Sequence, residues 1–239
     1  MAVRCYGCMR MKNASPVCEY CGHDERQQNY AHQLPVGTVL NGQYLVGRVL
    51  GQGGFGITYM GWDLNLAIPI AIKEYYPSGT VSRECSHSLR VTGIIAEREA
   101  QFRRNRERFI QEARTLARLR SVPGIVGIHN FFQENDTAYI VMEYLDGTTL
   151  RKYTELCGGR VVAYRALELM QPVMLALQQV HAVDLVHRDI SPDNIMLMLD
   201  GSLKLLDFGA SREVVDADVD KNLARSTEAI LKHQIARIA

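Results

Sequence analysis

Residues 186–209 read VHRDISPDNIMLMLDGSLKLLDFG, and their pattern decides the fold because it describes a hairpin. Residues 195–199 and 203–206 are short, apolar and strand-like. The Asp200-Gly201 pair between them is favoured in tight turns where the backbone needs a positive φ. The stretch therefore predicts two antiparallel strands joined by a tight turn.

Polar side chains stand at both ends of this hairpin. Asp189 and Asn194 precede it, and Asp207 follows it. Closing the turn should bring two carboxylates and an amide oxygen towards one place. Oxygen ligands of this kind bind hard cations, and a carboxylate can also act as a base. The hairpin is thus predicted to carry a cation site and a catalytic base.

The chain as a whole has the composition of a soluble globular protein. Its 239 residues suffice for one large or two modest domains, and its net charge of +1 gives no reason to expect a nucleic acid partner. No apolar run approaches the roughly 20 residues that span a bilayer, and the N-terminus lacks the apolar core of a signal peptide. These features predict a cytoplasmic protein without a membrane segment in this chain.

Four cysteines near the N-terminus form two Cys-x-x-Cys pairs, Cys5 with Cys8 and Cys18 with Cys21. Four thiolates suit tetrahedral zinc, and a ribbon this small has too few apolar residues to fold without a metal. A redox dithiol is the alternative, which two correctly spaced pairs disfavour. Residues 1–24 are therefore predicted to form a zinc ribbon.

A glycine-rich segment, GQGGFG at residues 51–56, follows a polar and turn-rich linker predicted at residues 25–42. Glycines let backbone N–H groups approach a phosphate without a Cβ in the way. A dinucleotide-binding fold would need a helix directly after the last glycine, but residues 57–59 (ITY) favour a strand. The segment is thus predicted to join two strands of a hairpin, residues 44–50 and 57–62.

Lys73 lies near the end of a further predicted strand, residues 68–74, where it closes the run Ile70-Ala71-Ile72-Lys73. Alternation places Ala71 on the same face as Lys73. A lysine at a strand end is usually solvated, but this one follows a phosphate-type loop at hairpin distance. Residues 97–120 then predict a helix with Glu112 beside its apolar stripe. That stripe consists of Phe102, Phe109, Ala113 and Leu116.

The elements between this helix and the opening hairpin are a strand pair and two helices. The strands are expected at residues 125–132 and 137–143, and the helices at residues 148–156 and 162–182. Pro172 should kink the second helix. Its predicted buried stripe is Leu167, Met170, Met174, Leu177 and His181.

Residues 44 to about 232 resemble the eukaryotic-like serine/threonine protein kinases of bacteria. Five motifs in the family's order carry the resemblance: the loop at residues 51–56, Lys73, Glu112, His187-Arg188-Asp189 with Asn194, and Asp207-Phe208-Gly209. The cysteines separately resemble zinc-ribbon modules attached to such kinases. The resemblance implies an α+β bilobal kinase fold over residues 43–239, with a β-rich N-lobe and a helical C-lobe, preceded by a small zinc ribbon with four cysteine ligands.

The resemblance also implies a role for each motif. Lys73 would hold the α- and β-phosphates of ATP and pair with Glu112, while Asp207 and Asn194 would bind magnesium. Asp189 would accept the proton of a serine or threonine hydroxyl on a protein substrate. The positions implied to surround the nucleotide are Leu50, Gly51, Gly53, Gly54, Phe55, Gly56, Thr58, Ala71, Lys73, Met142, Glu143, Leu145 and Met196.

The chain departs from the family pattern in three ways. Ser191 stands where many members have a lysine, so one positive charge near the γ-phosphate is absent. Thr58 stands where valine is usual, which is nearly isosteric. The third departure is that the family's Ala-Pro-Glu motif and later helices are missing beyond Asp207. We therefore expect a kinase domain truncated after its activation segment. Its exposed C-lobe surface would be open to a partner.

Two hypotheses about function follow. The first is a serine/threonine protein kinase that uses ATP and Mg²⁺. The second is a catalytically defective kinase fragment that acts as an ATP-binding or zinc-ribbon interaction module.

Overall fold

The computed structural model of the chain describes residues 3–83, 88–94, 98–120, 122–182, 185–187, 189–206 and 212–213. The chain divides into two compact units. The first consists of Met1–Ala113 and Ile128–Tyr144, and the second of Arg114–Gly127 and Leu145–Ala239.

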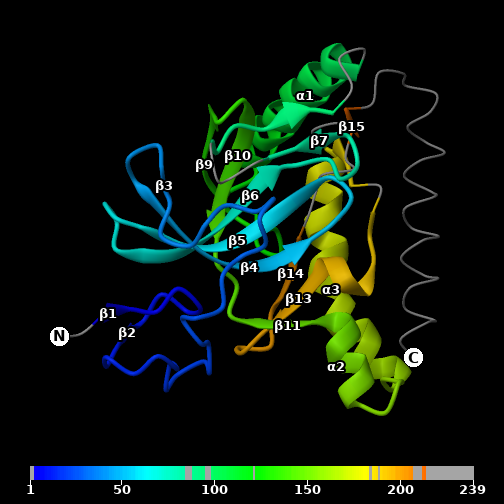
Figure 1. Cartoon of the computed structure of the whole chain (residues 1–239). Helices are drawn as coiled ribbons and strands as arrows, with labels where there is room; N and C mark the ends of the chain where they lie inside the picture. Colours follow the sequence, from blue (N-terminus) through cyan, green and yellow to red (C-terminus); the bar gives the residue numbers. More distant parts are fainter. Residues whose placement is uncertain are drawn as a thin grey trace. The chain divides into compact units, whose positions relative to one another are not determined.

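The largest sheet in the described part of the first unit has six strands in the order β3-β4-β5-β6-β10-β9 (Figure 1). In chain order these strands are β3 (Val39–Leu40), β4 (Tyr44–Gln52), β5 (Gly56–Asp63), β6 (Ile68–Tyr75), β9 (Ile128–Glu134) and β10 (Thr137–Glu143). The predicted strands at residues 44–50, 57–62 and 68–74 are therefore confirmed as successive hairpins. The β9–β10 turn falls at Asn135 and Asp136, whose φ angles of 53° and 58° suit these residue types.

The register of the sheet gives it two chemically different faces. Glu74 lies opposite Ile57 on β5 and Tyr139 on β10, so it shares a face with Tyr59. Its carboxylate accepts hydrogen bonds from the hydroxyls of Tyr59 (2.9 Å) and Tyr139 (2.8 Å) and pairs with the guanidinium of Arg83. The side chains of Glu74 and Arg83 are both fully buried. An ion pair thus forms part of the core on this face.

The electrostatics of this cluster follow from burial and from the Glu74 charge. Burial raises the pKa of Tyr59 and of Tyr139, and the neighbouring carboxylate raises both further, so both hydroxyls stay protonated. Burial alone would lower the pKa of Arg83, but its bonds to Glu74 outweigh that and raise it.

Helix α1 (Glu99–Arg118) meets the sheet on the opposite face. The ring of Tyr75 packs against those of Phe102 and Phe109, with centroids 5.3 Å and 5.4 Å apart. Tyr75 and Lys73 are two residues apart on β6, so they share this face. The predicted stripe of α1 is confirmed, because Phe102, Phe109, Ala113 and Leu116 are all buried.

The N-terminal residues belong to the first unit. Strands β1 (Val3–Arg4) and β2 (Met11–Lys12) pair with each other, and the guanidinium of Arg4 lies 3.7 Å from the centre of the Trp62 ring. Leu34 and Leu40, from the segment predicted as a linker, are fully buried. Strands β7 (Val81–Ser82) and β8 (Thr92–Gly93) form a further short antiparallel pair. The domain boundaries at residues 24 and 42 stay predictions.

The second unit contains a small sheet in the order β11-β13-β14. Its strands are β11 (Gly147–Thr149), β13 (Ile195–Met198) and β14 (Leu203–Leu205). Gly201 has a φ of 82°, which confirms the predicted turn between β13 and β14. A strand was predicted at residues 125–132, but Ile125 instead forms an isolated bridge with Leu205. Two further short strands, β12 (Leu185–Val186) and β15 (Arg212–Glu213), pair with each other.

Two helices complete the described part of this unit, α2 (Leu150–Leu156) and α3 (Ala163–His181). The first begins later than predicted because residues 147–149 pair with β13, and the side chain of Thr149 caps it. The predicted stripe of α3 was partly wrong: Met170 and Leu177 are buried, but Leu167 is 51% exposed. Pro172 lies inside α3. No helix of the described residues is both long and apolar enough to cross a membrane.

Candidate active site and four-cysteine cluster

The glycine-rich segment forms the turn between β4 and β5, as predicted. The N–H of Gly53 donates to the carbonyl of Gly56 (2.9 Å), which closes the turn. A Cβ on Gly56 would lie 2.4 Å from the carbonyl oxygen of Glu74, so glycine is needed where β5 pairs closely with β6. Around Gly53 and Gly54 the space is open, with no atom within 4 Å of where a Cβ would be. The backbone there is accessible to a ligand.

Lys73 lies beside this turn. It is directly opposite Thr58 on β5, and its Cε is 3.8 Å from where a Cβ on Gly56 would be. The side chain is largely buried, with 9% of the residue exposed. A cation thus lies next to the last glycine of a loop with open backbone, an arrangement that suits a phosphate.

Among the other nucleotide positions of the first unit, Thr58, Ala71 and Met142 share this face with Lys73. Ala71 is opposite Met142 on β10, and the half-buried Glu143 ends that strand. Glu112 lies on α1, half-buried, on the helix that packs against this face. Its pairing with Lys73 stays a prediction, as do the roles of the half-exposed Leu50 and the exposed Gly51 and Phe55.

The second unit carries the predicted catalytic base on a tightly connected loop. The side-chain N–H of Asn194 donates to both the backbone carbonyl (2.8 Å) and the carboxylate (2.9 Å) of Asp189. Asp189 is exposed, so its carboxylate is accessible. Asn194 ends a short 3₁₀ helix, η2 (Pro192–Asn194), which turns the chain back towards Asp189. The predicted convergence of these two residues is therefore present.

His187 fixes the start of this loop. Its ring is fully buried and bonds through Nε2 to the carbonyl of Leu206 (2.8 Å) and through Nδ1 to the N–H of Asp189 (3.3 Å). A carbonyl accepts, so Nε2 carries the proton, and Nδ1 is then free to accept from Asp189. Leu206 in turn donates to the carbonyl of Asn194 (2.7 Å). These bonds link the segment before the hairpin to Leu206, the residue directly before residue 207.

Several predicted residues cannot be placed in this way. Asp207 and Arg188 lie outside the described residues. Leu145 is buried and Met196 is half-buried on β13, both in the second unit. Their contacts with a nucleotide stay predictions.

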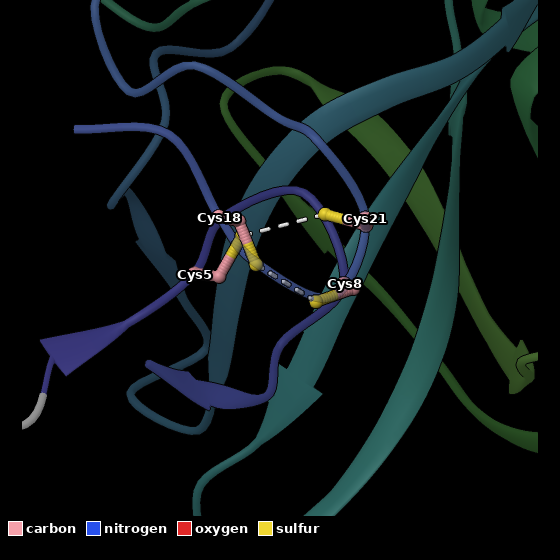
Figure 2. Close-up of side chains that lie close together, drawn as sticks. All are labelled: Cys5, Cys8, Cys18 and Cys21. Atoms are coloured by element: carbon pink, nitrogen blue, oxygen red, sulfur yellow. Dashed lines mark hydrogen bonds between the residues drawn. The ribbon is translucent and has the colours of Figure 1, made fainter. Parts of the chain in front are cut away.

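The four cysteines come together, as their spacing predicts. Figure 2 shows the four sulfurs pointing towards one another, and they all lie within 4.8 Å of each other. The Sγ atoms of Cys5 and Cys21 are 3.7 Å apart, and those of Cys8 and Cys18 are 3.8 Å apart. These distances exclude disulfides between those pairs, whose sulfurs would be about 2.0 Å apart. The cluster could hold a metal ion.

The protonation of these thiols is uneven. Burial acts to raise the pKa of Cys18, but hydrogen bonds from the backbone of Tyr20 and Cys21 outweigh it and lower that pKa to about 7. Burial raises the pKa of Cys5, Cys8 and Cys21. Thiolates are the form that binds metals, so Cys18 is the readiest of the four to act as a ligand.

One set of contacts near the glycine-rich turn gave no signal in the sequence. The side-chain oxygen of Gln52 accepts hydrogen bonds from His32 (3.1 Å) and Gln33 (2.8 Å). Both donors lie in the segment predicted as a linker. Only the folded chain brings these residues together, because they are about 20 positions apart.

Comparison with known proteins shows the same family that the motifs indicate. The family model described as protein kinase domain matches residues 44–228. A probable serine/threonine-protein kinase of Streptomyces coelicolor is 34% identical over 182 residues, which is 74% of this chain and 24% of that protein. The serine/threonine-protein kinase PrkC of Bacillus subtilis is 32% identical over 73% of this chain and 24% of its own length. PknA of Mycobacterium tuberculosis is 33% identical, with 77% and 39% covered.

The solved structures agree with the sequence relatives. A structure titled PpkA-294 apo form is 34% identical and superposes with a TM-score of 0.66, covering 82% of this chain and 67% of that one. The chain spans between a quarter and two fifths of the length of the curated relatives named above. The family model covers well over half of the chain, and the motifs on the glycine-rich hairpin and the Asp189 loop are those of the same family, so the chain belongs to the protein kinases.

Proposed function

We propose that this chain transfers the γ-phosphoryl group of ATP to serine or threonine hydroxyls of a protein substrate. The observation that carries the proposal is the bond from Asn194 to Asp189. It fixes one carboxylate oxygen of an exposed aspartate while the backbone bond to the same residue fixes the loop. A carboxylate held in this way can orient a hydroxyl for in-line attack and accept its proton.

The first unit supplies what a nucleotide needs. The open backbone at Gly54 can donate its N–H group to a phosphate oxygen, and Lys73 can neutralise the phosphate charge. Thr58, Ala71 and Met142 lie on the same face as Lys73 and would offer an apolar surface to the adenine.

Asn194 is also suited to a magnesium ion. Its side-chain nitrogen faces Asp189, so its Oδ1 is the atom left for a cation, with Asp207 as the second proposed ligand. Magnesium, when bound, would supply positive charge that neutralises the phosphates. Ser191 brings no positive charge of its own, so neutralisation of the phosphates would depend more on Lys73 and magnesium.

The test is phosphoryl transfer by the full chain with labelled ATP, magnesium and a generic basic protein. Asp189→Asn keeps an oxygen for the bond from Asn194 but loses the base, so transfer should fall roughly 10²- to 10⁴-fold while nucleotide binding persists. Asp200→Asn is the matched control, since Asp200 accepts bonds from Ser202 that an amide oxygen can also accept. Nucleotide binding without any transfer by the unaltered chain would establish the binding-module alternative instead.

We also infer that the four-cysteine cluster holds one structural zinc ion. Four thiolates around zinc, with Zn–S bonds of about 2.3 Å, form a tetrahedron with edges of about 3.8 Å. The Cys5–Cys21 and Cys8–Cys18 sulfur separations of 3.7 Å and 3.8 Å fit that size. Reduced thiols suit the cytoplasm, where we place the protein.

Metal analysis tests the zinc site. We expect one zinc per chain, lost in Cys18→Ser and retained in Cys157→Ser, a matched control at an exposed free cysteine. Freshly purified protein that contains no zinc, or that contains iron with its visible absorption, would contradict the assignment.

A further inference from the structure

The cysteine ribbon lies directly on strand β4, which leads into the glycine-rich turn. The N–H of Arg48 donates to the carbonyl of Tyr6 (2.9 Å), and its side-chain Nε donates to the carbonyl of Gly7 (3.0 Å). A Cβ on Gly47 would lie 2.4 Å from the carbonyl oxygen of Tyr6. Tyr6 and Gly7 stand between two cysteines of the cluster, so the geometry of the cluster sets where these carbonyls lie.

A second contact to β4 comes from Asn29. Its amide nitrogen donates to the carbonyl of Gly47 (3.1 Å), and its amide oxygen accepts from the N–H of Val49 (3.2 Å). The register between β4 and β5 shifts between Val46 and Val49. Asn29 therefore holds β4 where its pairing with β5 is irregular.

The third contact reaches the turn itself. Gln33 is buried and donates to the side-chain oxygen of Gln52, while its own amide oxygen accepts from the N–H of Tyr30 (2.9 Å). The Tyr30 bond fixes the orientation of the Gln33 amide, so its nitrogen must face Gln52. His32 donates to the same oxygen. Gln52 is the last residue of β4, directly before Gly53.

The far side of the turn is held by a different segment. The N–H groups of Tyr76 and Ser78 donate to the carbonyls of Phe55 (3.2 Å) and Gly54 (3.1 Å). The ring of His32 lies 5.9 Å from that of Tyr76, so both supports of the turn meet at this histidine. Phe55 is 63% exposed. Among the described hydrogen bonds, its carbonyl accepts from the N–H of Tyr76 alone. Gln52 is thus one of a small number of points that determine where the turn lies.

We propose that Gln33 is a positioning residue for the nucleotide: through Gln52 it fixes the glycine-rich turn. The metal-loaded ribbon holds strand β4, which leads into that turn. This rests on the proposed function in one respect, that the turn binds a nucleotide. A free turn must lose conformational freedom when a nucleotide binds, whereas a turn already held in place loses less. The ribbon would therefore raise nucleotide affinity without touching the nucleotide.

Two readouts test this on the full chain. Nucleotide affinity is measured with a fluorescent ATP analogue, and hydrogen exchange is measured on peptides covering residues 44–56. Gln33→Ala should weaken nucleotide binding roughly fivefold, about the worth of one hydrogen bond, and speed exchange in residues 50–56. In transfer assays KM for ATP should rise by a similar factor, while kcat changes less than about twofold. Gln28→Ala, at an exposed glutamine of the same segment, should change neither readout.

A double variant separates positioning from general destabilisation. Gln52 is exposed, so Gln52→Ala leaves the core intact even if Gln33→Ala folds poorly. If Gln33 acts through Gln52, the double variant should bind nucleotide as weakly as Gln52→Ala alone. Removing the metal with a chelator should speed exchange at Arg48 and in residues 50–56 and weaken nucleotide binding by a similar factor.

The outcomes are distinct. Additive effects of the two substitutions, or unchanged exchange in residues 50–56 of both variants, would overturn the positioning role. Unchanged exchange after metal removal would overturn the part assigned to the ribbon. If the unaltered chain bound no nucleotide, the proposed function would fail, while the exchange measurements would still decide whether Gln33 holds the turn.

Discussion

The buried ion pair between Arg83 and Glu74 gives the sharpest prediction about stability. In Arg83→Met, a side chain of similar length stays in the core but the cation is lost. The Glu74 carboxylate, which is fully buried, would then keep only the two tyrosine hydroxyls as partners among its described contacts. Removing one partner of a buried pair typically costs about 3–5 kcal/mol, because the remaining charge is stranded away from water.

The control is an ion pair of the same kind at the surface. Arg90 pairs with Asp136, but their side chains are 68% and 46% exposed. Water already solvates both charges, so Arg90→Met should cost at most about 1 kcal/mol. The expected difference between the two variants is therefore about 2–5 kcal/mol.

Urea unfolding followed by tryptophan fluorescence measures this difference. Trp62 is the single tryptophan of the chain and lies on β5, so its signal reports on the first unit. The double variant Arg83→Met with Glu74→Gln removes both charges, and it should be more stable than Arg83→Met alone. The reasoning is refuted if Arg83→Met costs no more than Arg90→Met, or if the double variant shows only the sum of the two single effects.

Two further predictions concern a close backbone contact and a helix cap. Gly56→Ala should lower the free energy of unfolding of the first unit by about 1–3 kcal/mol, because the new Cβ would lie 2.4 Å from a backbone carbonyl oxygen. Gly53→Ala, with no atom within 4 Å of the new Cβ, should leave urea unfolding unchanged. Thr149→Ala should cost about 1 kcal/mol in thermal unfolding, because the hydroxyl that accepts from the N–H of Lys152 at the start of α2 is lost, and Thr149→Ser should restore most of it. An equal loss in both members of either pair would contradict the stated cause.

The parts of the fold that depend on neighbouring residues could be predicted from the sequence. Asp200-Gly201 and Asn135-Asp136 mark turns because these residue types tolerate positive φ, and both turns are present. The stripe of α1 was correct because apolar residues recur at a single helical spacing. In α3 apolar residues are adjacent to one another, at residues 166–167, 169–170 and 172–177, so spacing alone could not distinguish Leu167, which is exposed, from Ala166, which is fully buried.

The candidate site was predictable for the residues with local motifs and not for those with distant partners. Asp189, Asn194 and Lys73 were found because their spacing is characteristic of a family. Gln33 and Asn29 escaped notice because a polar residue in a turn-rich segment ordinarily faces water. Their partners lie 18 to 20 positions away, and only the folded chain shows that their amides bond to β4.

Consecutive residues of β6 connect the two faces of the sheet. Lys73 belongs to the face with the glycine-rich turn, and Glu74 to the face on which Arg83 and the N-terminal segment lie. The carbonyl of His32 accepts from Arg83 (3.3 Å), and the N–H of Leu34 donates to the hydroxyl of Tyr59 (3.0 Å), so the segment that carries Gln33 also completes the Glu74 cluster. Because one backbone holds both residues, a change that loosens Glu74 should also loosen Lys73. Arg83→Met should therefore weaken nucleotide binding even in conditions where the unit stays folded, and a loss of stability with unchanged affinity would show that the two faces act independently.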